Sequence, residues 1–187
     1  MSFRERWRAA TAETHTQVDR RFSRCDLGRA DEHRSFLHAH LTVLPGCESA
    51  LEASDAGRSL ADWSSRVRTP ALVADLDQIG GAPAPGTLAM PPLSSAAAFG
   101  MLRVLEGPRL GGSVPARRVL ANPDARCREA TRYLRHGEGS RFWPVFLDAM
   151  EASPDIRADQ GAAVTSAIAT FALFRSAAGA MPTGHDR

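Results

Sequence analysis

His15 is the residue of this chain whose setting best suits it to bind a metal ion. A helix is predicted over residues 3–22, because apolar side chains recur along one face from Trp7 to Phe22. A neighbouring polar stripe runs along the same helix at spacings of three and four residues: Arg8, Thr11, His15 and Asp19. A neutral imidazole can ligate iron when an acceptor on its other nitrogen fixes the tautomer. The alternative is that His15 is an ordinary core or boundary residue of an amphipathic helix.

The other histidines are less suited to metal binding. His33, His38 and His40 fall on one predicted helix, but no two of them form the i, i+4 pair of a helical zinc site. His40 lies on the apolar face of that helix, so it is most simply a buried and hydrogen-bonded histidine. His136 and His185 fall in a loop and in the C-terminal tail. The sequence contains no P-loop, G-x-S-x-G, H-E-x-x-H or G-x-G-x-x-G motif.

A glycine-rich stretch over residues 94–120 is the second candidate for a site. Ser94 is a suitable N-cap, and Phe99, Leu102 and Leu105 follow at helical spacing. Next come three glycines and a proline within six residues: Gly107, Pro108, Gly111 and Gly112. An interior glycine costs a helix roughly 1 kcal/mol and a proline roughly 3 kcal/mol, so this run would normally end the helix.

The helical pattern resumes after these glycines, through Val114, Arg117 and Leu120. This predicts one long helix with a kink in its middle. Two helices joined by a glycine turn would give the same local pattern, and the pattern does not separate the two. In either case glycine leaves the backbone bare, so a flat or bulky molecule could lie directly against it.

The elements that would position these residues are all predicted to be helices, because alternating β-branched runs do not occur together. We expect an all-α domain of about eight helices, with one domain over residues 1–180 and a flexible tail over 181–187. Beyond the two stretches above, helices are expected over residues 30–44, 59–67, 69–79, 122–134 and 140–151, and from 154 onward. Pro45-Gly46 kinks or interrupts the first of these, which could continue over 47–53. Thr69 is the expected N-cap for Pro70, and a loop is expected over 81–92.

Composition excludes several classes of protein. The chain has 187 residues, of which 43% are apolar and 24% charged, as in an ordinary globular domain. A net charge of +2 with dispersed arginines does not suggest nucleic acid as a partner. No apolar run approaches ~20 residues and the N-terminus lacks a signal-peptide core, so we expect a cytoplasmic protein without a transmembrane helix. Cys25, Cys47 and Cys127 show no CxxC spacing and are expected to be reduced thiols.

Taken together, the helical histidine and the glycine-broken helix resemble the haem oxygenase family, closest to its short bacterial members associated with bacteriophytochromes. Four segments carry the resemblance: RAATAETHTQVD over residues 8–19, VLEGPRLGGSV over 104–114, RFWPVFLDAM over 141–150 and ATFALFRSAAG over 169–179. In order and spacing they span nearly the whole chain. The resemblance implies an all-α, single-domain fold in which haem is sandwiched between a proximal helix and a kinked distal helix.

The resemblance also implies a role for individual residues. His15 would be the iron ligand, and Gly107, Gly111 and Gly112 would form the catalytic cover over the distal face of the haem. The other implied haem-binding residues include three basic partners of the haem propionates, and the full set is Arg8, Thr11, Arg103, Arg141 and Phe171.

By resemblance, haem would be both cofactor and substrate. Dioxygen and reducing equivalents would open its ring to biliverdin, with release of carbon monoxide and ferrous iron. The implied partners are a ferredoxin or similar reductase as electron donor and a phytochrome that accepts the biliverdin.

The sequence departs from the family pattern in three places. Pro108 replaces a serine, and because proline offers neither a side-chain hydrogen bond nor an amide donor, distal water would have to be held by backbone carbonyls or by Arg109. Arg103 stands where many relatives have a tyrosine, and Pro115 follows closely on the glycines. Pro108 favours an alternative function, a haem-binding sensor, store or carrier that does not degrade haem. A third reading is a helical scaffold that binds no haem, in which His15 is a core residue.

Overall fold

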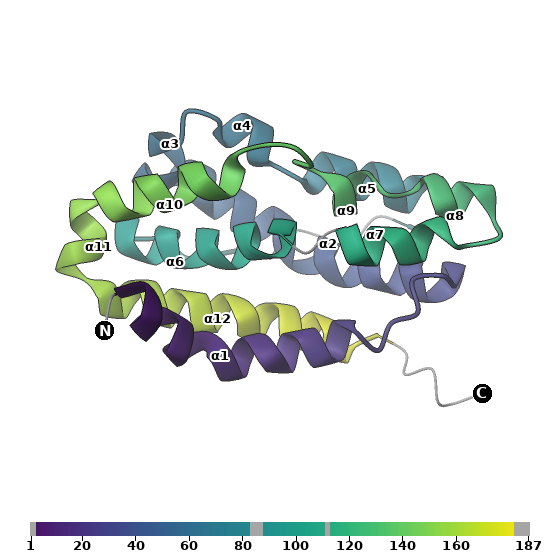
Figure 1. The fold of residues 1–187 in the computed structure, drawn as a ribbon, viewed down its shortest axis with the longest axis horizontal. Coiled ribbons are helices and arrows are strands. Elements are labelled where there is room, and N and C mark those ends of the chain that lie inside the picture. The colour runs from purple at the N-terminus through teal and green to yellow at the C-terminus, as the bar shows by residue number, and fades with distance from the viewer. Residues whose placement is uncertain (1–2, 83–87, 111–112, 182–187) are drawn as a thin grey trace.

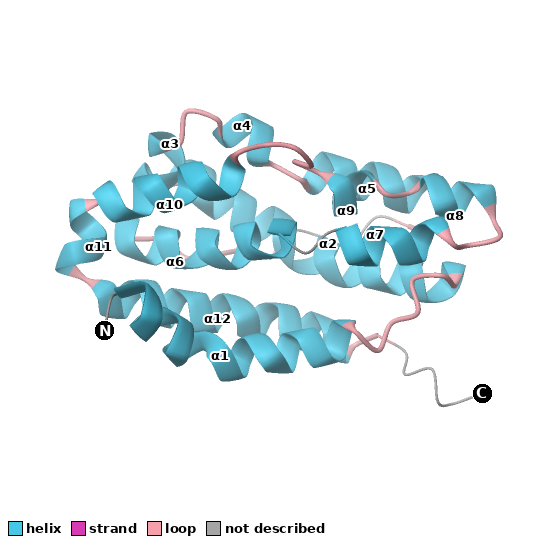
Figure 2. Ribbon diagram, viewed as in Figure 1, coloured by secondary structure: helices cyan, strands magenta, loops and turns pink. Residues whose placement is uncertain are grey.

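The computed structural model describes residues 3–82, 88–110 and 113–181 (Figure 1). Over these residues the regular structure is entirely helical (Figure 2), which confirms the predicted all-α fold. Gly111 and Gly112 lie outside the described residues. Cys25, Cys47 and Cys127 are buried free thiols, as expected.

Two long helices form one side of the molecule. Helix α1 (Phe3–Phe22) runs beside α12 (Gln160–Gly179), and α12 packs in turn on α6 (Ser95–Glu106) (Figure 1). Helix α2 (Ala30–Ala53) contacts α12, α6 and α5 (Thr69–Gln78), while α10 (Phe142–Ala152) contacts α6. The first, middle and last helices of the chain are therefore neighbours.

The crossing of α6 and α12 depends on small side chains. A Cβ atom built on Gly100 of α6 would lie 2.1 Å from the carbonyl oxygen of Ala163 on α12, closer than real Cβ atoms approach. Ala163 and Ala167 are both fully buried at this crossing. Helix α12 is long and apolar enough, by length and composition, to cross a membrane; 33% of this stretch is buried inside the structure, where α12 packs on α1 and α6.

Helix α2 continues through Pro45-Gly46, where the sequence left an interruption open. Gly46 is needed because the carbonyl oxygen of Leu88 lies against it, and a Cβ atom there would be 2.2 Å from that oxygen.

The middle of the chain follows the predicted pattern. The Ser94 hydroxyl accepts a hydrogen bond from the Ala97 amide and caps α6, which ends at Glu106. A 3₁₀ turn, η1 (Gly107–Leu110), follows, because Pro108 has no N–H to continue the helix. Helical structure resumes in α7 (Ser113–Leu120).

Elsewhere the helices are more numerous and shorter than the eight predicted, because polar residues cap helices that the sequence did not predict, either between or inside the predicted ones. Ser54 caps α3 (Asp55–Ser59), Asp124 caps α8 (Ala125–Glu129) and Asp159 caps α12 by accepting hydrogen bonds from backbone amides. The helices predicted over 59–67, over 122–134 and from 154 onward were therefore wrong in extent. In their place the structure has α4 (Trp63–Arg66), α8 and α9 (Arg132–Arg135), and α11 (Pro154–Ala158) and α12, while α3 ends at Ser59, where the first of them was predicted to begin.

Helix α5 begins one residue earlier than predicted. Its N-cap is Arg68 rather than Thr69, because Glu48 of α2 accepts hydrogen bonds from the Arg68 amide, the Thr69 amide and the Thr69 hydroxyl. Asp75 of the same helix, fully buried, accepts a hydrogen bond of 2.8 Å from the Tyr133 amide, which fixes α9 against α5.

Candidate functional site

A cavity of about 400 Å³ lies between the α1–α12 pair and the end of α6. Helix α1 contributes His15 and its neighbours, α12 contributes Phe171 and Phe174, and η1 contributes Gly107, Pro108 and Arg109. The remaining lining comes mainly from aromatic, histidine and arginine side chains of α2, α6, α9 and α10 and of the residues that cap α5 and α9: Phe36, His40, Arg68, Arg103, Tyr133, His136 and Trp143. The cavity is thus mostly apolar, with polar groups at defined places on its wall.

His15 is held in one orientation by a carboxylate and an aromatic ring. Its Nδ1 lies 2.9 Å from Oδ2 of Asp19, one helical turn further along α1. The edge of the ring meets Phe171 at a centroid distance of 5.4 Å. Glu13, the other acid near it in sequence, instead accepts a hydrogen bond from Gln17. With Nδ1 occupied, Nε2 is the nitrogen left for a ligand.

Gly107 gives the cavity an open patch of backbone. A Cβ atom built on Gly107 would meet no atom within 4 Å, although the residue lines the cavity and has helical backbone angles. Pro108 lines the cavity beside it and is exposed. The backbone at Gly107 is therefore open toward the cavity.

The predicted site residues do not all reach the cavity. His15, Thr11, Arg103, Gly107 and Phe171 line it. Thr11 is buried and its hydroxyl donates to the Trp7 carbonyl at 3.0 Å, so its polar group is already used within α1.

Two predicted propionate partners lie elsewhere. Arg8 and Arg141 are exposed and are not among the residues that line the cavity. The third, Arg103, stacks its guanidinium 4.7 Å above the ring of Trp143, at the boundary with a smaller pocket of about 120 Å³.

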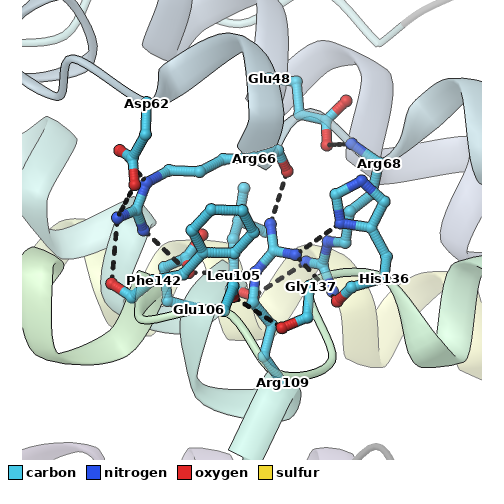
Figure 3. A network of polar contacts seen from close by, with 11 residues as sticks. Glu48, Asp62, Arg66, Arg68, Leu105, Glu106, Arg109, His136, Gly137 and Phe142 are labelled. Atoms are coloured by element: carbon cyan, nitrogen blue, oxygen red, sulfur yellow. Dashed lines mark hydrogen bonds and ion pairs between the residues drawn. The ribbon is translucent and has the colours of Figure 1, made fainter.

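A buried charge network lies beside the cavity at the end of α6 (Figure 3). Glu106 is 1% exposed, and its Oε2 lies 3.0 Å from both Arg66 Nη1 and Arg109 Nε. Arg66 also forms a bidentate pair with Asp62 at 2.7 and 2.9 Å. Arg68 donates to the Leu105 carbonyl at 2.8 Å. Three arginines and two acids thus tie the end of α6 to α4 and to the segment before α5.

Two histidines of the wall are neutral at pH 7. Burial lowers the pKa of His40 to about 4, and burial together with the Arg109 charge lowers the pKa of His136 to about 4. His40 was predicted to be a hydrogen-bonded core histidine, and its Nδ1 lies 2.8 Å from the Phe36 carbonyl. That prediction did not foresee that His40 also lines the cavity.

The sequence did not point to Arg68, Tyr133 or His136 as residues of the site. They come from different short segments, and only tertiary packing brings them to one wall. The sequence held a weak signal for His136, which directly precedes two closely spaced glycines, Gly137 and Gly139. In the structure Gly137 has a φ of +79° and forms a turn there. Within the described residues no group of three histidines, cysteines or acids could hold a metal ion by itself.

The residues present fit haem. A histidine with a carboxylate behind it suits the iron, aromatic and aliphatic walls suit the macrocycle, and the patch at Gly107 leaves room for one face of the ring. An all-α fold with these features is the arrangement expected of a haem-binding protein.

Comparison with known proteins identifies the family. The chain is 31% identical over 147 residues to a protein named Heme oxygenase from Xanthomonas campestris pv. campestris, which covers 79% of this chain and 88% of that protein. Its fold is similar to that of the heme oxygenase of Neisseria meningitidis, solved with NO and CO bound, with a TM-score of 0.73 and 22% identity over 98% of each chain. No protein-family model matches the sequence. The chain belongs to the haem oxygenase family, and it is an enzyme.

Proposed function

We propose that this enzyme opens the ring of haem to biliverdin, with release of carbon monoxide and ferrous iron, and that haem is both its substrate and its cofactor. The observation that carries the proposal is the His15–Asp19 pair, which lines the same cavity as the bare backbone at Gly107. When bound, haem supplies the oxygen chemistry, using dioxygen and electrons from a donor. The protein's task is to ligate, orient and shield it.

His15 would ligate the iron through Nε2. Its Nδ1–H donates to the Asp19 carboxylate at 2.9 Å, which keeps the Nε2 lone pair available for the iron. Phe171 limits rotation of the imidazole from the α12 side.

Three arginines are proposed as partners of the propionates. Arg103 is the best placed, because it lines the cavity and its guanidinium is held over Trp143. Arg8 lies about two turns before His15 on α1, and Arg141 is the N-cap residue of α10. Both are exposed, so each would have to reach the edge of the haem from outside the cavity wall.

On the distal side, Gly107 would let the backbone approach the haem closely. The same role is proposed for Gly111 and Gly112 from the sequence alone. Pro108 is the feature that favours the second candidate function, haem binding without degradation. We prefer degradation because Arg109 and His136 place polar groups on the wall beside Pro108.

The resemblance to the family further predicts a ferredoxin or similar reductase as electron donor, a phytochrome as acceptor of biliverdin, and a cytoplasmic location. These remain predictions about the setting in which the enzyme works.

The test is a visible spectrum of the protein with one equivalent of hemin, followed in air after addition of a reductant and catalase. Catalase removes free peroxide, so that non-enzymatic bleaching is not mistaken for turnover. A sharp Soret band that decays while a broad red biliverdin band rises supports the proposal. A Soret band that stays stable under reduction would support haem binding without degradation. If hemin showed no Soret shift at all, the protein would not bind haem, as the scaffold alternative predicts.

A further inference from the structure

Arg109 and His136 form a buried pair on the wall of the cavity. Arg109 Nη1 lies 2.8 Å from Nδ1 of His136 and 3.2 Å from its carbonyl oxygen, and the Arg109 side chain is only 8% exposed (Figure 3). Arg109 Nε is paired with Glu106, and Nη2 donates to the Arg66 carbonyl. The guanidinium is therefore fixed from three sides and cannot turn away from the imidazole.

This pairing determines where His136 carries its proton. An arginine side chain has N–H donors and no acceptor, so Nδ1 of His136 must accept and must be unprotonated. A neutral imidazole then has its hydrogen on Nε2. Burial and the Arg109 charge lower the pKa of His136 to about 4, so the ring stays neutral at pH 7. Within the described part of the chain, Nε2 makes no hydrogen bond to the protein.

We propose that Arg109 fixes His136 as a hydrogen-bond donor of the distal cavity, and that its Nε2–H orients the water or small anion that occupies the open side of the haem iron. This inference rests on the proposed function for the haem, but the assignment of the proton does not. Arg109 is a positioning residue, and His136 is the group that would touch the ligand. The pair supplies a polar group next to Pro108, which has none of its own.

His40 provides an internal control for the assignment. Its Nδ1 lies 2.8 Å from the Phe36 carbonyl, which can only accept, so His40 must carry its proton on Nδ1. Two neutral histidines of one cavity are therefore expected to be opposite tautomers.

The first experiment is a ¹⁵N NMR spectrum of the imidazoles in the apoprotein at pH 7, which distinguishes protonated from bare ring nitrogens. We expect His136 to be protonated on Nε2 only and His40 on Nδ1 only. Protonation of His136 on Nδ1, on both nitrogens or on a mixture of the two would overturn the assignment. The wild-type chain suffices, so the result does not depend on a variant that folds.

The second experiment measures azide binding to the ferric hemin complex by its visible spectrum. Because a hydrogen bond to a charged group contributes enough for about a tenfold change in affinity, we expect His136→Phe to bind azide about tenfold more weakly. The matched control is His38→Phe, which alters a histidine of α2 that does not line the cavity and should leave the azide affinity unchanged. Equal azide affinity in His136→Phe and wild type would overturn the donor role.

The positioning role of Arg109 is tested with Arg109→Gln against Arg118→Gln, an exposed arginine of α7. We expect only Arg109→Gln to give a mixed tautomer at His136 and weaker azide binding, and an unchanged tautomer in a folded Arg109→Gln protein would contradict the role. Failure of the wild type to take up hemin would refute the proposed function, while the NMR spectrum would still decide the Arg109–His136 assignment by itself.

Discussion

Substitution of Gly107 should separate the stability of the protein from its capacity for haem. A Cβ atom at Gly107 meets nothing within 4 Å, and the backbone angles there, φ −53° and ψ −49°, are those of a helix. Gly107→Ala should therefore stabilise the apoprotein by about 0.4–1 kcal/mol, because alanine restricts the unfolded chain more than glycine does. For a chain of this length, each 1 kcal/mol corresponds to about 2–4 °C in Tm.

The same position should not tolerate a larger side chain when haem is present. Gly107→Leu would project four carbon atoms from a residue that lines the cavity, into the space proposed for the distal face of the ring. We expect the hemin affinity to fall at least tenfold, which corresponds to about 1.4 kcal/mol. Hemin binding is measured by titration of the Soret band, and apoprotein stability by thermal unfolding followed by circular dichroism.

Gly100, in the helix that Gly107 caps, is the matched control. A Cβ atom at Gly100 would lie 2.1 Å from the Ala163 carbonyl oxygen, so Gly100→Ala should lower the Tm of the apoprotein because α6 and α12 must move apart. The reasoning would be refuted if Gly107→Ala destabilised the apoprotein as Gly100→Ala does, or if Gly107→Leu bound hemin as tightly as the wild type.

Three further predictions concern charge and burial. Arg103→Gln should weaken hemin binding several-fold more than Arg8→Gln, because Arg103 lines the cavity and Arg8 is exposed. Equal losses of hemin affinity in a Soret titration would contradict the larger role given to Arg103. His33 is fully buried, and burial lowers its pKa to about 4 from 6.5. As pH falls from 6.5 towards 4 the unfolded chain takes up the proton first, so His33 alone should lower the free energy of unfolding by up to ~3 kcal/mol, in addition to the contributions of His40 and His136, whose pKa values are lowered in the same way. His33→Leu should flatten that slope in urea unfolding, and an unchanged slope would show that His33 does not cause it. Glu106→Gln leaves Arg66 and Arg109 without their shared buried acid and should cost about 3 kcal/mol, against less than about 1 kcal/mol for Glu138→Gln in an exposed pair. Equal Tm shifts in these two variants would contradict the importance of the buried network.

The sequence was most informative where a pattern was long or chemically unusual. Helix α1 was predicted with its observed bounds, since its apolar and polar stripes persist for five turns. The cap at Ser94 was also confirmed, because serine N-caps have a strong local effect. The predicted kink takes the form of an end of α6 at Glu106 followed by the 3₁₀ turn η1. Membership of the haem oxygenase family followed from short motifs in order, and the comparisons confirmed it.

Local patterns failed where tertiary contacts decide the structure. Glu48 moves the start of α5 by one residue through contacts 20 and 21 positions away. Asp124 and Asp159, by contrast, are local N-caps that start helices inside segments predicted to be continuous. The tautomer of His136 depends on Arg109, 27 residues earlier. Such pairings require the fold, and no spacing in the sequence encodes them.

The most direct test of the account is the iron–histidine stretching band in the resonance Raman spectrum of the ferrous hemin complex. We predict that the wild-type protein shows this band, that His15→Ala lacks it, and that added imidazole restores a band in the variant. Asp19→Asn should lower the frequency of this band. A neutral amide oxygen accepts a weaker hydrogen bond from Nδ1–H than a carboxylate does, so the imidazole donates less charge to the iron. A band that persists unchanged in His15→Ala would mean that another residue ligates the iron, and the central claim would be wrong.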